Sequence, residues 1–279
     1  MGRLLSTLAA AGVAAAVTTV VRRAADQRPP GGTDRWTRTN HRGEPISLLE
    51  GPAVAAGLVA GSLAGGGDAR TRGAVALATA SAGTFGLVDD LAEDTSTRTK
   101  GLRGHLGALA HGQVTTGGLK VLGIGGTALV AAAVGTRRTG GAFAHLVDVG
   151  VNGALVAGTA NLLNLLDLRP GRALKAATAV SAPFLVTSAA PTTGAVLGAA
   201  VAAAPGDLAE RDMLGDCGAN ALGAVLGSQV AFTAPRAVRW LALAGVVGLT
   251  LASEKVSFSR VIEGNDVLRR VDTWGRRPA

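Results

Sequence analysis

Residues 85–94 read Phe-Gly-Leu-Val-Asp-Asp-Leu-Ala-Glu-Asp, and they end an apolar run that begins near Gly73. An apolar stretch of roughly 17 to 20 residues is what a helix needs to cross the hydrocarbon core of a bilayer. The pair Asp89-Asp90 is therefore expected where lipid meets water. Two adjacent carboxylates can hold Mg²⁺ there and leave coordination positions open for phosphate oxygens. The alternative is that the acids only end the helix, although the helix dipole disfavours acids at a C-terminus.

The composition indicates a polytopic membrane protein. The 279 residues are 48% hydrophobic and only 16% charged, with 41 glycines and no tyrosine. Ala, Val and Leu with Gly between them allow helices to pack closely in a membrane. The net charge of +8 would suit a nucleic-acid partner, but the basic residues lie between apolar runs without interleaved aromatic residues, so no nucleic-acid partner is expected. A single cysteine, Cys217, excludes an internal disulfide and a cysteine-based metal site.

The apolar segments predict an all-α transmembrane helix bundle with about nine crossings. Residues 22–45 are expected to form a polar loop and residues 253–279 a polar tail, so the chain is interpreted as one integral membrane domain. The predicted helices are residues 4–21, 46–64, 73–90, 114–134, 142–163, 173–189, 191–204, 217–233 and 237–252.

The distribution of Lys and Arg predicts the orientation. With the N-terminus outside, 19 of the 27 Lys and Arg residues fall in cytoplasmic segments and 7 fall outside. This bias follows the positive-inside rule and makes the C-terminus cytoplasmic. We therefore expect a multi-pass protein of the plasma membrane with its carboxylate clusters on the cytoplasmic face. The tail is also expected to lie on anionic lipid, through an apolar strip of Val256, Phe258, Val261 and Ile262.

Two further polar clusters are predicted on the cytoplasmic face. Asn161, Asn164 and Asp167 recur at a spacing of three near the end of an apolar helix, so they lie close together on one helical face. Asp216 precedes a new helix. It is expected either to be the N-cap of that helix or to contact a phosphate or metal ion at the positive helix end.

The remaining charged residues within or between the apolar segments are predicted to have the following roles. Lys120, inside an apolar helix, either contacts a phosphate or extends along the helix to the membrane interface. His145 and Asp148 are three residues apart on one helix and are expected to pair with each other. A solvated acidic loop is expected to contain Asp207, Glu210 and Asp212.

Taken in order, these motifs resemble the polyprenyl-phosphate N-acetylhexosamine-1-phosphate transferases, a family that includes phospho-N-acetylmuramoyl-pentapeptide transferase. The match covers most of the chain. The similar segments are Thr39-Asn-His-Arg-Gly43 to N-x-R-G, Gly86-Leu-Val-Asp-Asp90 to G-x-x-D-D, Lys100-Gly-Leu102 to K-G-L, Asn161–Asp167 to N-x-x-N-x-x-D, and Gly215-Asp-Cys-Gly-Ala219 to G-D-x-G-S.

The chain departs from the family pattern in two places. The family usually continues its N-x-x-N-x-x-D motif with G-x-D-G, but here Asp167 is followed by Leu-Arg-Pro-Gly, so Pro170 stands where a second aspartate is usual. The His-rich last cytoplasmic loop of the muramoyl-pentapeptide enzymes has no counterpart in residues 253–279, which contain no His. The resemblance therefore describes the acceptor side better than the donor sugar.

The resemblance implies Mg²⁺-dependent transfer of an N-acetylhexosamine-type sugar-1-phosphate from a UDP-sugar to a polyprenyl phosphate such as undecaprenyl phosphate. UMP is released, and the product serves cell-envelope glycan or peptidoglycan synthesis. Phosphoryl transfer needs positioning and charge neutralisation more than a covalent catalyst. The implied catalytic residues are Asp89, Asp90 and Asp167; Asp90 and Asp167 would bind Mg²⁺, and Asp89 would orient the lipid phosphate or act as a base. The implied substrate-binding residues are Asn40, Arg42, Lys100, Arg103, Asn161, Asn164 and Asp216.

The alternative class is a membrane transporter for a cation or small solute, with Asp89, Asp90 and Asp167 lining a pathway. Transporters usually place such sites near the bilayer midplane and often show internal repeats. Here the acids end the helices and no repeat is evident, so the sequence favours the transferase. A homologue that has kept the fold and lost turnover is the third interpretation. A homodimer is one of the oligomeric states that the sequence allows.

Overall fold

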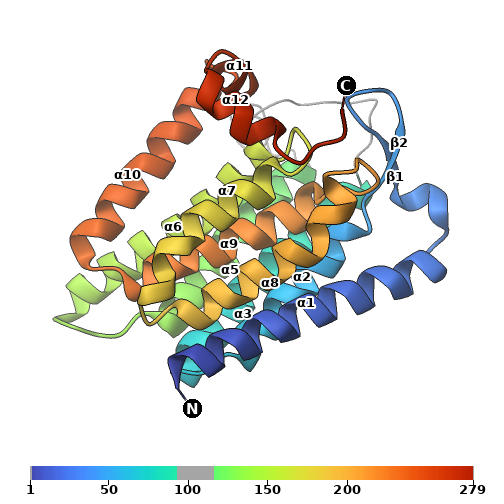
Figure 1. Ribbon diagram of the computed structural model, residues 1–279. Coiled ribbons are helices and arrows are strands. Elements are labelled where there is room, and N and C mark those ends of the chain that lie inside the picture. Colours follow the sequence, from blue (N-terminus) through green and yellow to red (C-terminus); the bar gives the residue numbers. More distant parts are fainter. Residues whose placement is uncertain (1, 93–115, 279) are drawn as a thin grey trace.

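The computed structural model describes residues 2–92 and 116–278, and most of these residues are helical (Figure 1). Five of the described helices are long and apolar enough to cross a membrane. They are α1 (Arg3–Gln27), α3 (Ala69–Ala92), α5 (Thr116–Gly135), α6 (Ala142–Leu166) and α10 (Arg236–Ser253). The expected all-α fold with apolar, membrane-length helices is thereby confirmed.

The interior of the bundle is built from three further helices, α2 (Glu50–Ala64), α8 (Ala190–Asp207) and α9 (Gly215–Thr233). Most residues of α9 are buried, because this helix packs between α3 and α6. α1 covers α2 and α8 along the opposite side of the bundle. The clusters of acidic and polar residues at the ends of α3, α6 and α9 are therefore held on one central helix and its two neighbours.

Small residues set the distance between these helices. A side chain added at Gly86 would overlap the carbonyl oxygen of Asp216, so α3 and α9 cross backbone to backbone there. On the other side of α9, a side chain at Gly223 would overlap the carbonyl oxygen of Thr159 on α6. Membrane helices associate through such small-residue contacts, because lipid supplies no hydrophobic force between them.

Two predicted helices are shorter than expected. The prediction of a helix over residues 173–189 is wrong: α7 spans Arg172–Ser181 and is followed by a 3-10 helix, η2 (Ala182–Val186). Pro183 explains the change, because it has no backbone N–H to continue the α-helical pattern. The helix predicted from residue 46 begins at Glu50, since Ile46 and Ser47 belong to a strand and Leu49 is the N-cap residue.

The polar segment 22–45 has more structure than predicted. α1 continues to Gln27, and a 3-10 helix, η1 (Thr33–Trp36), leads into an antiparallel hairpin of β1 (Thr37–Thr39) and β2 (Pro45–Ser47). Gly43, at a φ of 81°, permits the turn between the strands. Trp36 packs with Leu48 and Leu49, which fixes the hairpin to the start of α2.

The polar tail also contains two short helices, α11 (Phe258–Glu263) and α12 (Asp266–Thr273). The side chains of Ser257 and Asn265 accept hydrogen bonds from the first backbone N–H groups of these helices and so define where they begin.

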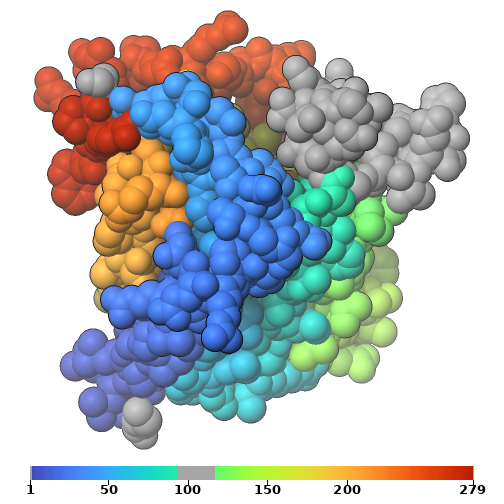
Figure 2. All heavy atoms as spheres, turned by 90° about the vertical axis from the view of Figure 1, so that its right-hand side faces the viewer, coloured from blue at the N-terminus to red at the C-terminus, as the bar shows by residue number. Residues whose placement is uncertain are grey.

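The described polar segments 28–49, 167–171, 207–214 and 253–278 meet at one end of the bundle (Figure 1). Arg22 donates to Asp212 Oδ1 at 3.0 and 2.7 Å. The backbone N–H of Arg277 donates to the carbonyl of Leu208 at 3.1 Å. Figure 2 shows the red tail bordering the blue residues of the hairpin segment, where Arg42 donates to the carbonyl of Pro278 at 3.2 Å. The acidic motifs therefore share one end of the molecule.

Candidate functional site

Asp90, in the last turn of α3, caps the start of α9. Its Oδ1 accepts a hydrogen bond from the backbone N–H of Asp216 at 3.0 Å, and its Oδ2 accepts one from Cys217 at 2.9 Å. The N-cap position of α9 is Leu214, which has no side-chain acceptor. A carboxylate there satisfies unpaired N–H groups and faces the positive end of the helix dipole. The N-cap role predicted for Asp216 is therefore wrong, because residue 216 already lies in the first turn and α3 supplies the cap.

Lys120 joins the carboxylates of two other helices. Its Nζ lies 2.7 Å from Oδ2 of Asp89 and also makes a short ion pair with Asp216. The three side chains are 17%, 16% and 25% exposed, so the ion pairs are largely removed from water. The side chain of Lys120 thus points to the carboxylates at the ends of α3 and α9. Lys120 is absent from the catalytic residues that the motifs implied, although a single cation within an apolar helix is itself a signal of function.

Asp167 follows α6 and approaches the same cluster. Burial raises the pKa of this carboxyl well above its ordinary value, and the charges of Asp207, Asp216 and Asp90 raise it further, against the backbone N–H of Gly215. Its Oδ2 is buried and accepts no hydrogen bond from the described residues. An unpartnered buried carboxylate oxygen is costly unless it binds a proton or a cation. The structure thus brings Asp89, Asp90, Asp167 and Asp216 together from three helices.

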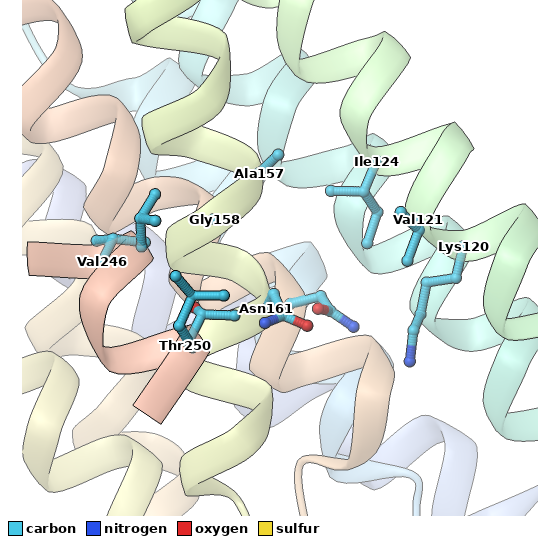
Figure 3. A pocket seen from close by; sticks show the side chains of 11 residues that line it. Lys120, Val121, Ile124, Ala157, Gly158, Asn161, Val246 and Thr250 are labelled. Atoms are coloured by element: carbon cyan, nitrogen blue, oxygen red, sulfur yellow. The ribbon is translucent and has the colours of Figure 1, made fainter. Parts of the chain in front are cut away.

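An apolar cavity of about 290 Å³ begins beside Lys120, between α5, α6 and α10 (Figure 3). Apolar side chains such as Val121, Ile124 and Val246 line most of it. Lys120 and Asn161 lie at its polar part together with Asn220, whose Nδ2 donates to the carbonyl of Asp216 at 2.7 Å. The cavity can therefore hold an apolar group whose charged end meets an ammonium group.

The other asparagine of the α6 motif, Asn164, is half-buried one turn before Asp167. Its backbone carbonyl accepts a hydrogen bond from the N–H of Asp167 at 3.2 Å, which ends the helix. Lys100 and Arg103, the implied phosphate contacts of the K-G-L segment, lie outside the described residues.

Asn40 and Arg42, the hairpin residues that the motif implied in substrate binding, both contact Glu210. Asn40 Nδ2 lies 3.2 Å from Glu210 Oε2, and Arg42 Nε lies 3.1 Å from the same oxygen. Arg38 reaches the acidic cluster instead, because its guanidinium donates to the backbone carbonyl of Asp90. The sequence gives little indication of this contact, because Arg38 lies in a short strand and belongs to none of the motifs.

Two predictions about charged residues outside the motifs are wrong, the solvated acidic loop and the pair of His145 and Asp148. The acids at 207, 210 and 212 do not form a solvated loop, since these residues are only 3%, 4% and 8% exposed. The loop folds back onto its neighbours, and Asp207 Oδ1 accepts a hydrogen bond from the N–H of Gly171 at 2.8 Å. His145 does not pair with Asp148 among the described residues; Arg236, at 2.9 Å, is the nearest partner of that carboxylate.

The tail fixes the turn that follows Asp167. Asp272 accepts hydrogen bonds from Arg172 at 2.8 and 3.1 Å and from Arg276 at 2.6 Å. Arg276 also donates to the carbonyl of Pro170 at 2.8 Å. Burial acts to raise the pKa of Asp272, but the hydrogen bonds and charges of Arg172 and Arg276 outweigh it and hold the pKa below its usual range.

The chemistry of the donor set fits Mg²⁺. This ion prefers oxygen ligands, and the buried Oδ2 of Asp167 is an oxygen without a hydrogen-bond partner among the described residues. Within residues 2–92 and 116–278, no three acidic, His or Cys side chains are already grouped as a complete metal site. Mg²⁺ is commonly held by one or two carboxylates together with substrate phosphates, so such a site is completed by its substrate.

No protein-family model matches the sequence, and no curated protein matches it either. The fold and the site define a helical protein with membrane-length apolar helices, in which acidic helix ends and one lysine meet beside an apolar cavity.

Proposed function

We propose that this protein transfers an N-acetylhexosamine-type sugar-1-phosphate from a UDP-sugar to a polyprenyl phosphate and releases UMP. One observation carries the proposal: Lys120, paired with Asp89 and Asp216, lies at the polar part of an apolar cavity. A prenyl phosphate has this combination of an apolar chain and a charged end. The motif resemblance, which covers most of the chain, supports the same reaction.

In this proposal the cavity beside α10 binds the first part of the polyprenyl chain, and Lys120 binds its phosphate. An ammonium group meets phosphate as a point charge with rotatable donors, so Lys120 can turn from the carboxylates toward the incoming oxygens. The second pKa of a phosphate monoester is near 6, so the acceptor is mostly dianionic at neutral pH. Asp89 therefore needs to orient the phosphate and its lysine more than to remove a proton.

Asp167 and Asp216 would hold Mg²⁺ against the donor pyrophosphate. When bound, the ion neutralises charge on the phosphate oxygens and positions them for in-line transfer. Asp90 would take part mainly through position, because both of its oxygens already accept backbone hydrogen bonds from the start of α9. Asn161 and Asn164, on the α6 face that leads to Asp167, are proposed to bind the substrates.

The proposal includes the topology of nine crossings, with the N-terminus outside and the acidic end in the cytoplasm of a plasma-membrane protein. The gathering of the described polar segments at one end of the bundle supports it. A cytoplasmic site gives access to nucleotide sugars, while the apolar cavity gives access to the lipid acceptor.

The test is UMP release by purified protein in nanodiscs with undecaprenyl phosphate, Mg²⁺ and a panel of UDP-sugars. We expect release that requires both the acceptor and one particular sugar. As a control, farnesol replaces the prenyl phosphate, because it keeps an apolar chain and lacks the charge that Lys120 would bind. Absence of UMP release with every sugar would contradict the proposal. Cation flux through proteoliposomes in that case would favour the transporter.

A further inference from the structure

α12 has an apolar face that points away from the rest of the protein. Val267 and Val271 lie four residues apart on one side of the helix, and Trp274, the C-cap residue directly after Thr273, follows Val271 by three residues on the same side. These residues are 68%, 57% and 76% exposed. Apolar side chains that are exposed side by side in this way mark a surface that contacts a membrane or another protein.

The opposite side of α12 is fixed to the bundle. Asp272 is only 7% exposed, and its carboxylate is held by Arg172, the first residue of α7. Lys175 of α7 adds a hydrogen bond to the backbone carbonyl of Asp272 at 2.7 Å. Because these contacts fix the rotation of α12, the direction of its apolar face is also fixed.

The position of α12 relates this face to a bilayer. α12 begins at Asp266, a short distance along the chain from the end of α10 at Ser253, and the two lie at the same end of the molecule (Figure 1). α10 is a candidate membrane span in which no residue is buried by the rest of the protein. The residues that follow such a span lie where hydrocarbon gives way to headgroups.

The charges next to the apolar face are basic. Arg270 precedes Val271 and borders the face, whereas Arg269 points to the other side and pairs with Asp266 at 2.7 Å. Basic side chains beside an apolar strip are attracted to anionic headgroups, and tryptophan is enriched at the membrane interface. The apolar strip expected at residues 256–262 is less suitable, because Phe258 and Ile262 are half-buried.

We infer that α12 lies in the membrane interface, with Val267, Val271 and Trp274 inserted among the lipids and Arg270 facing anionic headgroups. The occupant of the apolar face is thus the anionic bilayer that surrounds α10. This inference goes beyond the proposed reaction and does not depend on it, since it concerns how the tail is held and not what the site transfers.

Tryptophan fluorescence tests this inference. The double substitution Trp36→Phe and Trp240→Phe leaves Trp274 as the only tryptophan of the chain. In nanodiscs of phosphatidylcholine and phosphatidylglycerol, we expect lipids brominated near the headgroup end of the acyl chain to quench its emission at least twofold more than lipids brominated near the chain end. Unquenched emission with full access to acrylamide would overturn the inference. Unquenched emission that is shielded from acrylamide would overturn it too, because it would indicate a protein partner.

Matched arginine variants test the contribution of charge. Arg270→Gln is expected to reduce the quenching that phosphatidylglycerol promotes, and Arg269→Gln to change it little, because Arg269 already pairs with Asp266. Equal effects of the two variants would contradict the assigned orientation of the helix. If the double tryptophan variant does not fold, a nitroxide on Val267→Cys gives the same information, since Cys217 is buried and Trp274 is kept. Greater access of oxygen than of a water-soluble nickel chelate would support burial in lipid, and the reverse would overturn it.

Discussion

The Nζ atom of Lys120 lies 2.7 Å from Oδ2 of Asp89. The same ammonium pairs with Asp216, so one charge on α5 joins α3 and α9. Both carboxylates come from helix ends, and the two ion pairs are largely removed from water. Removal of the lysine would leave two like charges close together in a poorly solvated place, which is unfavourable unless one of them binds a proton or another cation.

Lys120→Gln is expected to lower both stability and UMP release. Breaking a buried ion pair typically costs about 3–5 kcal/mol, because the remaining charge has no partner. Thermal unfolding in detergent measures the loss, and Lys120→Arg serves as the control that keeps the charge. The additional change Asp89→Asn is expected to restore part of the stability of Lys120→Gln without restoring activity. A double variant no more stable than Lys120→Gln would show that the two charges do not interact.

Asp90→Ala is expected to loosen the first turn of α9. The substitution leaves the N–H groups of Asp216 and Cys217 without their acceptors, and each unsatisfied buried group costs about 1–3 kcal/mol. Hydrogen exchange of these two amides is expected to rise more than that of amides in the middle of α9. Asp90→Asn keeps an acceptor oxygen and is expected to show a smaller rise. Unchanged exchange in Asp90→Ala would show that the carboxylate is not the cap.

Gly86→Ala is expected to separate α3 from α9, because the added Cβ would overlap the carbonyl oxygen of Asp216. The carboxylates of Asp89 and Asp90 would then move away from α9, and both thermal stability and UMP release would fall. Gly73→Ala on the same helix is the matched control. A Cβ at residue 73 meets nothing within 4 Å, and alanine favours a helix over glycine by about 1 kcal/mol. A stable, active Gly86→Ala protein would contradict the close crossing.

Asp167→Asn tests the proposed metal site. The change removes a negative charge with little change in shape, and loss of such electrostatic stabilisation typically costs on the order of 10² to 10³ in rate. UMP release is measured across a Mg²⁺ titration, with Asp34→Asn, an exposed acid of η1, as the control. Near-normal turnover of Asp167→Asn at low Mg²⁺ would remove this residue from the mechanism.

Acidification is expected to weaken the docking of the tail, through protonation of Asp272. The pKa of Asp272 is lowered in the folded protein by Arg172 and Arg276, which outweigh burial. Because the pKa is lower in the folded protein, the ionised carboxylate of Asp272 stabilises the docked tail at every pH above the ordinary pKa of aspartate, about 3.9. This stabilisation is lost as the pH falls from there through the pKa that Asp272 has in the folded protein. Limited proteolysis of the tail is therefore expected to be slow at neutral pH and to accelerate only below about pH 4.

Asp272→Asn provides the control for this pH dependence. It removes the titrating group and leaves Arg172 buried without its charge partner. Cleavage of the tail is then expected to be fast at neutral pH and to change little on acidification. A variant that keeps the protection of the wild-type tail at neutral pH would show that this ion pair does not hold the tail.

The sequence predicts the helices best where apolar runs are long and uninterrupted, as in α1 and α6. It predicts the site in part, because Asp89, Asp167 and Asp216 each lie at the end of such a run, and ends of packed helices meet at one face of a bundle. It does not reveal the short elements. The helix expected to continue to residue 189 ends at Ser181 because of one proline. The hairpin depends on a turn in which Gly43 has a positive φ.

Long-range pairs account for the remaining errors. The acids at 207, 210 and 212 look solvated in sequence, because their partners lie elsewhere in the chain: Arg22 for Asp212 and Arg42 for Glu210. The same is true of Asp90, whose acceptor role depends on a crossing with α9 that only a folded chain contains. Pairing across a bundle depends on helix packing, and spacing along one helix gives no information about it.

The cavity beside Lys120 has α10 as its outer wall, and α10 packs mainly on α6, where Gly158 lies against Val246. Among residues 2–92 and 116–278, α10 is the single helix on that side of the cavity, so these residues set no limit on the length of a ligand. A prenyl chain that starts in the cavity would continue into the surrounding lipid after its first isoprene units. Short and long prenyl phosphates are then expected to be accepted alike, so selectivity toward the acceptor would come from its phosphate and its first double bonds.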